Sequence, residues 1–176
     1  MRRVTEISSV LVIAAVSFAV AQDHAVAPAS AKASTVSHPA KVKGSAHVAL
    51  NPSDMQWMDT PPTLARGAQM AVLFGDPSKT GLFILRVKAG DGYRIANHWH
   101  PTDEHISVIS GTFLVSAGDE TDVSKEMSLS AGGFTTMPAR MHHAAKFGGD
   151  TEIEVSGMGP FQINYVNPAD DPSKSH

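Results

Sequence analysis

The sequence predicts an all-β domain, a sandwich or a barrel of short strands. Short runs of β-branched, aromatic and aliphatic residues recur along the chain after its first third, with Gly, Pro, Asp or Ser between them. Such runs at spacings of about 8–12 residues are typical of all-β folds. Beyond the first 21 residues, no segment repeats its apolar residues with the period of a helix. The 176 residues, 42% of them hydrophobic, suffice for one domain with a core.

Residues 1–21 are predicted to be a signal peptide that precedes this domain. Arg2 and Arg3 stand before an apolar run over residues 10–20. Residues 19–21, Ala-Val-Ala, then supply small residues at the two positions that a signal peptidase recognises. The alternative is a short membrane anchor, but the run is shorter than the ~20 residues of a spanning helix. We expect cleavage before Gln22, and a periplasmic or secreted protein that has no contact with the membrane afterwards.

The rest of the chain is expected to form a spacer, one domain and a short tail. Residues 22–50 are rich in Ala, Ser, Lys and Val and carry no sustained apolar period, so we interpret them as a flexible spacer. Histidines in this spacer are far apart, which favours solvated linker residues over a metal-scavenging segment. The predicted domain covers residues 51–170, and residues 171–176 are the tail.

Nine runs within the domain are expected to be strands: 69–74, 81–87, 93–100, 105–109, 112–117, 134–137, 142–147, 152–156 and 161–166. Turn signals separate them, among them Ser110-Gly111 between the fourth and fifth runs. Residues 121–129 are compatible with one turn of helix or with a loop. The core of the domain is expected to contain Phe83, Phe113, Phe134, Met137 and Phe161.

The absence of cysteine and the charge limit what the domain can bind. Without cysteine, disulfides and thiolate ligands are excluded, so a metal would have to be held by His, Asp or Glu. The formal net charge is −3, and Lys and Arg are scattered along the chain. No basic stripe is available to follow a phosphate backbone, so we expect no nucleic-acid partner.

Three histidines and a glutamate form the most informative pattern in the sequence. His98 and His100 are two residues apart, which on a strand directs both side chains to the same face. Pro101 has no backbone N–H for the ladder of a central strand, so we expect the chain to bend there and to bring Glu104 back toward the pair. His143 opens a later strand. Three imidazoles and one carboxylate suit a divalent metal such as iron, manganese, zinc, nickel or copper, with positions left for water or substrate.

The first part of this pattern resembles the first conserved motif of the cupin superfamily. Gly92 is followed after five residues by His98-x-His100, after three more by Glu104, and after six more by Gly111. Every position of that motif is matched.

The second conserved cupin motif is matched in part. Gly132, then Pro138 after five residues, then His143 five positions later stand as in the family. Arg140 stands where a glycine is usual, and Phe147 where an asparagine is usual. The two departures leave all four metal-ligand positions matched, and they concern the turn after Pro138 and the strand that follows it.

The resemblance extends over roughly residues 55–168 and implies a fold, a metal and a function class. Stretches 75–79, 100–105 and 159–161, with Tyr165, are similar to a group of small exported bacterial cupins. The family implies a double-stranded β-helix, a jelly-roll barrel of six to eight strands, with one divalent metal bound inside. Small cupins often pair through edge strands, so a homodimer is an expectation as well.

Each candidate ligand has an alternative role. A single buried histidine more often serves as a hydrogen-bonded core residue, but the spacing of His98, His100 and His143 favours ligands. Glu104 could instead accept a hydrogen bond from a ligand or act as a catalytic base. Strand alternation places His105 opposite Glu104 and turns it away from the metal.

His142 and four other polar residues are weaker candidates. His142 also faces away from the metal, although it could assist proton transfer at the rim, where its near-neutral pKa suits general acid–base catalysis. We therefore assign the candidate catalytic roles to Glu104 and His142. Asn97, Arg94, Arg86 and Tyr165 could line the pocket or hydrogen-bond the ligands, or lie on an exposed strand face.

Two functions remain open from the sequence. The first is a metal-dependent enzyme, with dioxygenase-like chemistry ahead of isomerase, lyase or hydrolase chemistry, that acts on a small organic molecule. The second is a non-catalytic module that binds or senses a metal or a small molecule. A purely structural barrel would require the motif matches to be accidental.

Overall fold

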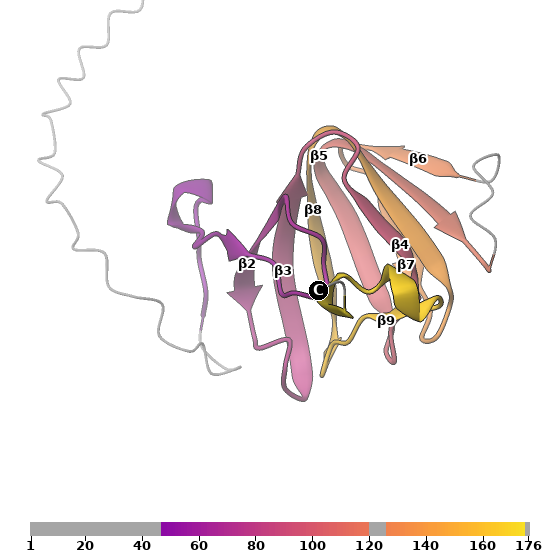
Figure 1. The fold of residues 1–176 in the computed structure, drawn as a ribbon. Helices are drawn as coiled ribbons and strands as arrows, with labels where there is room; N and C mark the ends of the chain where they lie inside the picture. Colours follow the sequence, from indigo (N-terminus) through magenta and orange to yellow (C-terminus); the bar gives the residue numbers. More distant parts are fainter. Residues whose placement is uncertain (1–46, 120–125, 175–176) are drawn as a thin grey trace, which may run out of the picture. The chain divides into compact units, whose positions relative to one another are not determined.

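The structure is a computed structural model, and it describes residues 47–119 and 126–174 (Figure 1). The predicted signal peptide and residues 22–46 of the predicted spacer lie outside the described residues. The regular elements of the described part are strands and three short 3-10 turns, which confirms the all-β prediction. None of the helices in the described ranges has the length and the apolar character needed to cross a membrane.

Nine strands make one antiparallel sheet. In chain order they are β1 (Met58–Asp59), β2 (Ala68–Phe74), β3 (Gly81–Ala89), β4 (Arg94–Trp99), β5 (Glu104–Ala117), β6 (Met127–Ser130), β7 (Phe134–Met137), β8 (His143–Gly159) and β9 (Asn164–Tyr165). Short 3-10 turns lie outside the sheet, η1 (Pro52–Asp54) before it, and η3 (Pro168–Asp170) and η4 (Pro172–Lys174) after it.

The two long strands, β5 and β8, hold the sheet together and curl it. They pair with each other, and each half then pairs with different neighbours. The second half of β8 pairs with β3 and its first half pairs with β4. The first half of β5 pairs with β7 and its second half pairs with β6. The halves therefore belong to two layers, and the space between the layers is the interior of the fold (Figure 1).

Glycine permits the sharp bend in each long strand. Gly111 in β5 has φ 76°, a left-handed conformation that favours glycine, and the register of β5 against β8 shifts on both sides of Ser110. A Cβ on Gly111 would lie 2.3 Å from Thr151 Oγ1. Gly149 in β8, with φ 72°, bends the partner strand nearby. The sequence predicts a turn at Ser110-Gly111 and separate strands over 142–147 and 152–156, but the structure shows two continuous strands with bends.

Thr151 ties the two bends together, and its replacement by Val is expected to destabilise the protein. Its buried Oγ1 accepts a hydrogen bond from Thr112 N at 3.0 Å and lies within 3.3 Å of three backbone carbonyl oxygens. Val has nearly the same shape but no hydroxyl, so the Thr112 amide loses its partner. We expect a loss of about 1–3 kcal/mol in the free energy of unfolding, measured by denaturant titration. The exposed Thr80→Val is the control, and equal stability of the two variants would contradict the assignment.

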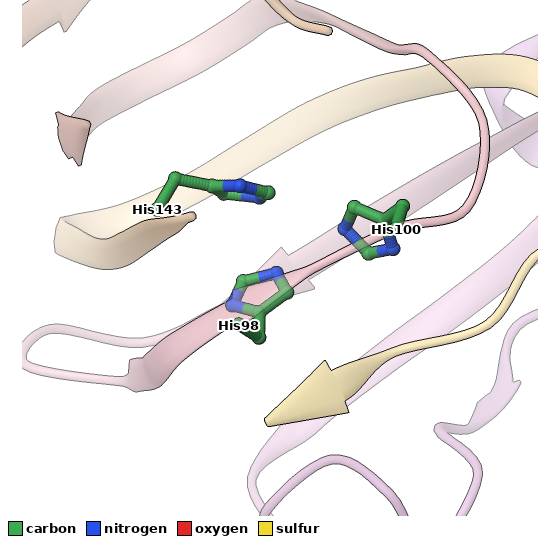
Figure 2. Close-up of side chains that lie close together, drawn as sticks. All are labelled: His98, His100 and His143. Atoms are coloured by element: carbon green, nitrogen blue, oxygen red, sulfur yellow. The ribbon is translucent and has the colours of Figure 1, made fainter. Parts of the chain in front are cut away.

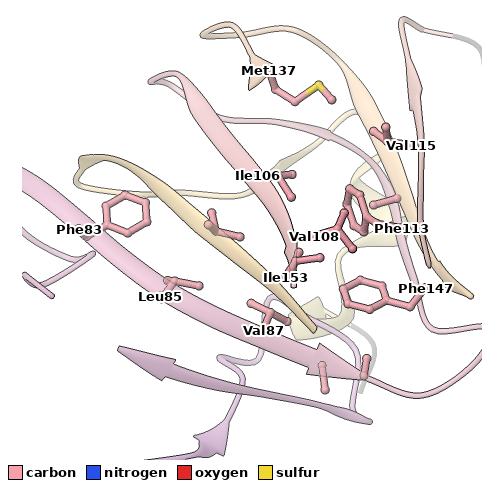
Figure 3. Packing of buried hydrophobic residues seen from close by; sticks show 14 residues of the cluster. Phe83, Leu85, Val87, Ile106, Val108, Phe113, Val115, Met137, Phe147 and Ile153 are labelled. Atoms are coloured by element: carbon pink, nitrogen blue, oxygen red, sulfur yellow. The ribbon is translucent and has the colours of Figure 1, made fainter. Parts of the chain in front are cut away.

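The apolar core lies in the interior between the two layers and extends to Phe83 and Met137, at the end of the sheet where Glu104 lies. Figure 3 shows the apolar side chains of β3, β5 and β8 packed against one another. Phe83, Phe113 and Met137 are buried, as the sequence predicts, and Phe161 packs partly buried against the core. Phe134 was expected in the core, but it is 59% exposed, because it lies on the outer face of β7 and stacks on His105.

One further expectation needs correction. Residues 127–129, for which a helical turn or a loop was expected, belong to strand β6, which pairs with β5. Their partners Phe113, Leu114 and Val115 supply an open strand edge, so pairing decides the conformation of a segment with weak local preference. Residues 121–125 of the same expectation lie outside the described residues.

Candidate metal centre

Three strand ends bring the four predicted ligands to one place between the two layers. His98 lies in β4 with His100 just beyond its end, Glu104 begins β5 and His143 begins β8. His98 and His143 are direct cross-strand partners. Nitrogen atoms of the three imidazoles, one from each ring, all lie within 4.8 Å of one another (Figure 2). The three histidines therefore converge, as the predicted fold requires.

Glu104 lies against two of the three rings. Its Oε2 is 3.5 Å from His100 Nε2 and 3.3 Å from His143 Nε2. All four residues are buried, with exposed fractions of 6% or less. The carboxylate therefore belongs to the same cluster, although the group whose ligand atoms are mutually within 4.8 Å contains the histidines alone.

Backbone carbonyl oxygens fix the orientation of each imidazole. His98 Nδ1 donates to Ala96 O at 2.7 Å and His143 Nδ1 donates to Met141 O at 2.9 Å, in each case two residues back along the chain. His100 Nδ1 donates to Gln162 O at 2.7 Å, on the segment before β9. A carbonyl oxygen can only accept, so the hydrogen of each neutral ring is on Nδ1 and its Nε2 carries a lone pair.

The cluster is chemically suited to a cation. His100 Nε2, His143 Nε2 and Glu104 Oε2 are buried and have no hydrogen-bond partner. Lone pairs of neutral imidazoles next to a carboxylate oxygen offer acceptors without a donor between them, an arrangement that is costly in a buried place unless a cation is bound. A divalent metal held by imidazole nitrogen atoms and a carboxylate removes that cost. The residues therefore fit the metal that the cupin resemblance implies.

The surroundings also favour the unprotonated state of the ligands. Burial lowers the pKa of His98 to about 3, and the nearby His143 and His100 act in the same direction. Burial alone would raise the pKa of Glu104, but contacts with His100 and His143 outweigh it and lower that pKa. A neutral imidazole and an ionised carboxylate are the forms in which these residues bind metals.

The metal-free protein is expected to lose stability as the pH falls from about 6.5 toward 3. His98 has an ordinary pKa of 6.5 and a folded-state pKa of about 3, so the unfolded chain binds more protons in this window. The contribution of neutral, buried His98 to stability is fully present above pH 6.5 and is lost as the pH falls toward 3. Thermal melting of chelator-treated protein across this range tests the effect. In His98→Leu the decline should be shallower, and an unchanged decline would show that His98 does not cause it.

Two neighbouring histidines lie outside the cluster. His105 is on the other face of β5, where its Nδ1 is 3.0 Å from Thr136 Oγ1 and its ring stacks on Phe134. His142 is partly exposed, and its Nδ1 contacts a carboxylate oxygen of Asp119. The structure therefore brings the predicted ligands together and leaves His142, the second candidate catalytic residue, outside the cavity that they line.

The predicted supporting residues have other partners. Arg86 pairs with two glutamates of β8 on the outer face, and Arg94 is exposed. Asn97 is buried, but its amide donates to the carbonyl oxygens of residues 118 and 119. The acceptors that orient the imidazoles are main-chain carbonyls, which a search of side chains cannot find. His98 and His143 each donate to the carbonyl oxygen two residues earlier, and these contacts become visible only once the strands are placed.

A cavity of about 660 Å³ opens onto the ligand cluster. Its walls come from both layers, and include Leu85, Val87, Ile106, Phe113, Ile153 and Val155. Volumes of this size, roughly 300–1,000 Å³, accommodate small organic molecules. The exposed residues Asp59, Ser78 and Gln162 also line it, so the cavity opens to solvent on their side.

Two tyrosines fasten the segment that borders the opening. Tyr165 Oη donates to Thr63 O at 2.6 Å and Tyr93 Oη donates to Ala65 O at 2.8 Å. Burial raises the pKa of each hydroxyl to about 12, so both remain donors at neutral pH. Tyr165 was predicted as a candidate pocket or ligand-binding residue; its hydroxyl holds the bordering segment instead.

At Arg140, where the family usually has glycine, the turn after Pro138 has a conformation that glycine favours. Arg140 has φ 65°, the left-handed conformation that the usual glycine adopts most readily. Its backbone N donates to His100 O at 2.8 Å, so the turn is joined to the segment that carries a predicted ligand. An arginine can therefore occupy the position, at the strain that a non-glycine residue has there.

Comparison with known proteins places the chain in a family and a fold. The profile of a family described as "Domain of unknown function (DUF4437)" matches residues 20–164. No curated protein matches the chain. Among solved structures, the polyketide cyclase RemF from Streptomyces resistomycificus superposes with a TM-score of 0.61 at 14% identity, over 73% of this chain and 92% of that one.

Two further solved structures are similar. A proposed acetylacetone dioxygenase from Methylibium petroleiphilum PM1 has a TM-score of 0.56 and 20% identity, over 74% of this chain and 89% of its own. An RmlC-like cupin from Shewanella frigidimarina NCIMB 400 has a TM-score of 0.52 and 17% identity, over 65% and 91%. Identities at this level establish a shared fold, which is that of the cupins, and leave the chemistry to the residues of the site.

Proposed function

Because this chain belongs to the DUF4437 family and has the cupin fold, we propose that it binds one divalent metal through His98, His100, His143 and Glu104. The observation that supports this most directly is the set of buried acceptor atoms on His100, His143 and Glu104 that have no hydrogen-bond partner. Iron, manganese, zinc, nickel and copper all accept such ligands, and metal availability helps to decide among them.

We further propose that the protein is an enzyme that acts on a small organic molecule with dioxygenase-like chemistry. A redox-active metal in such a site supplies positions for substrate and dioxygen, whereas a redox-inert one polarises a carbonyl group or activates water. Glu104 can accept a proton from an acidic C–H or O–H group of a molecule held against the imidazoles. Most of the wall around that place is apolar, which would favour the organic part of such a molecule. The similarity to a proposed acetylacetone dioxygenase is in keeping with this function.

A second candidate, a non-catalytic binding or sensing module, is favoured by one observation. Among the described residues that line the cavity, Glu104 is the buried carboxylate, and Asp59 is the other acid, exposed at the opening. His142, the other candidate for proton transfer, does not line the cavity. A site with a single buried carboxylate, itself next to the imidazoles, can bind a molecule without transforming it.

Elemental mass spectrometry of protein made without a histidine tag tests the metal proposal first. Close to one equivalent of iron, manganese, copper or nickel would support it and would direct oxygen-uptake assays to small diketones and phenols. Zinc alone would favour non-redox chemistry or binding. Protein that stays metal-free after reconstitution would exclude the proposed function. His142→Ala with unchanged turnover would exclude a catalytic role for His142.

We also propose that the mature protein works in the periplasm or is secreted. The basis is the basic start, the apolar run and the Ala-Val-Ala sequence before Gln22. N-terminal sequencing of protein from a periplasmic extract is expected to start at Gln22. Recovery of the full chain, starting at Met1, from the cytoplasm would contradict this localisation.

A further inference from the structure

Most of the cavity wall beyond the candidate metal centre is apolar, and polar residues such as Ser78 and Gln162 lie at the opening. Ile106 stands two residues after Glu104 in β5, and Ala145 two residues after His143 in β8, so both point into the same interior as the ligands. Phe113 and Ile153 continue the wall toward the bends of the long strands. A molecule held at the metal therefore extends from a polar end into an apolar chamber.

Few charged side chains line this cavity. Among the described residues that line it, there is no Lys or Arg, and the acid besides Glu104 is Asp59 at the opening. A divalent ion and the Glu104 carboxylate together carry a charge of +1. One negative charge on a bound molecule would neutralise the centre, whereas a second would lie in an apolar chamber without a cationic partner, which is costly.

We propose that the substrate is a largely apolar molecule that presents one oxygen-bearing end, able to carry a single negative charge, to the metal. Phenols and enolisable β-diketones have this chemistry, whereas dicarboxylates, sugar acids and phosphorylated compounds do not. The inference rests on the proposed metal-binding function and adds to it the class of substrate. The volume of about 660 Å³ is sufficient for an aromatic ring with a short side chain.

A matched pair of probes separates apolar from charged ligands. The first is 1-(4-methylphenyl)butane-1,3-dione, and the second is 4-(3-oxobutanoyl)benzoic acid, in which a carboxylate replaces the methyl group at the end remote from the diketone. Binding of each is measured by isothermal titration calorimetry under anaerobic conditions, so that turnover plays no part. Metal content is determined on the same metal-loaded sample. We expect the methyl compound to bind at least tenfold more tightly.

The outcomes distinguish this inference from the proposed function. Equal or tighter binding of the carboxylate compound by metal-loaded protein would overturn the substrate class and leave the metal site in place. Protein that cannot be loaded with metal would overturn both, because the charge argument requires the ion. Tighter binding of the methyl compound by loaded protein supports both.

An engineered cation supplies a second, independent arm. Leu64 lines the cavity and is partly buried, so Leu64→Lys would add the cationic partner that the chamber lacks. We expect the preference for the methyl compound to shrink by about tenfold. Leu82→Lys, at a leucine that is 49% exposed and outside the cavity lining, should leave the preference unchanged. Equal preferences in both variants, at unchanged melting temperatures, would count against the charge argument.

Discussion

His98→Ala and His143→Ala are each expected to remove bound metal from the protein. His98 and His143 are cross-strand partners, and each offers one nitrogen ligand to the site. Either substitution therefore removes one ligand. Loss of groups that merely support a ligand typically weakens metal binding by about 10–100-fold, so loss of a ligand itself should exceed that. Elemental mass spectrometry after extensive dialysis should give about one ion per chain for the parent protein and only background for the variants.

His105→Ala is the matched control for both substitutions. His105 follows Glu104 directly in the sequence, but it lies on the outer face of β5 against Thr136 and Phe134. Its removal should leave the metal content unchanged. If His105→Ala lost metal as fully as the other two variants, the effect would come from general destabilisation, and the assignment of ligands would be wrong.

Phe147→Asn is expected to cost about 3–5 kcal/mol in the free energy of unfolding, the range for removal of a large buried aromatic side chain. Phe147 is fully buried and packs edge-on against Tyr93 and Phe113, with ring centroids 5.5 Å apart in both pairs. Asparagine would leave a cavity between those rings and place an amide in apolar surroundings. Although asparagine is usual at this position in the cupin motif, it should be poorly tolerated here.

Denaturant titration measures this loss, with Phe134→Asn as the control. Phe134 is 59% exposed, so its replacement should change stability by no more than about 0.5 kcal/mol. A small effect at Phe147, comparable to that at Phe134, would mean that the core around Tyr93 and Phe113 repacks freely.

The sequence predicts most of the site because the ligand pattern is local. The spacing of His98, His100 and Glu104 is set by a strand end and a bend, both visible in the residues themselves. His143 reaches the other ligands because β4 pairs with β8. This pairing could be predicted only from the resemblance to a family with that topology. Orientation of the rings by carbonyl oxygens was not predictable, since every residue carries such an acceptor.

The fold was less predictable wherever pairing outweighs local preference. Ser110-Gly111 has the composition of a turn, yet β8 runs alongside both flanking segments and joins them into one bent strand. Phe134 was expected in the core because strand residues of its type usually pack inside. Register decides this question, since a shift by one residue exchanges the two faces. Neither the register of β7 nor the partner of β5 is encoded in a short run of residues.

The chain has no cysteine, so a bound metal is the means by which it could cross-link distant residues. An ion held by both His98 and His143 would connect two points separated by about 45 residues, as a disulfide does in many exported proteins. For a permanent bridge, a loop of this length corresponds to about 4 kcal/mol of lost freedom in the unfolded chain. The metal would then act as a reversible cross-link. Loss of metal would lower the free energy of unfolding of the barrel as well as remove its chemistry.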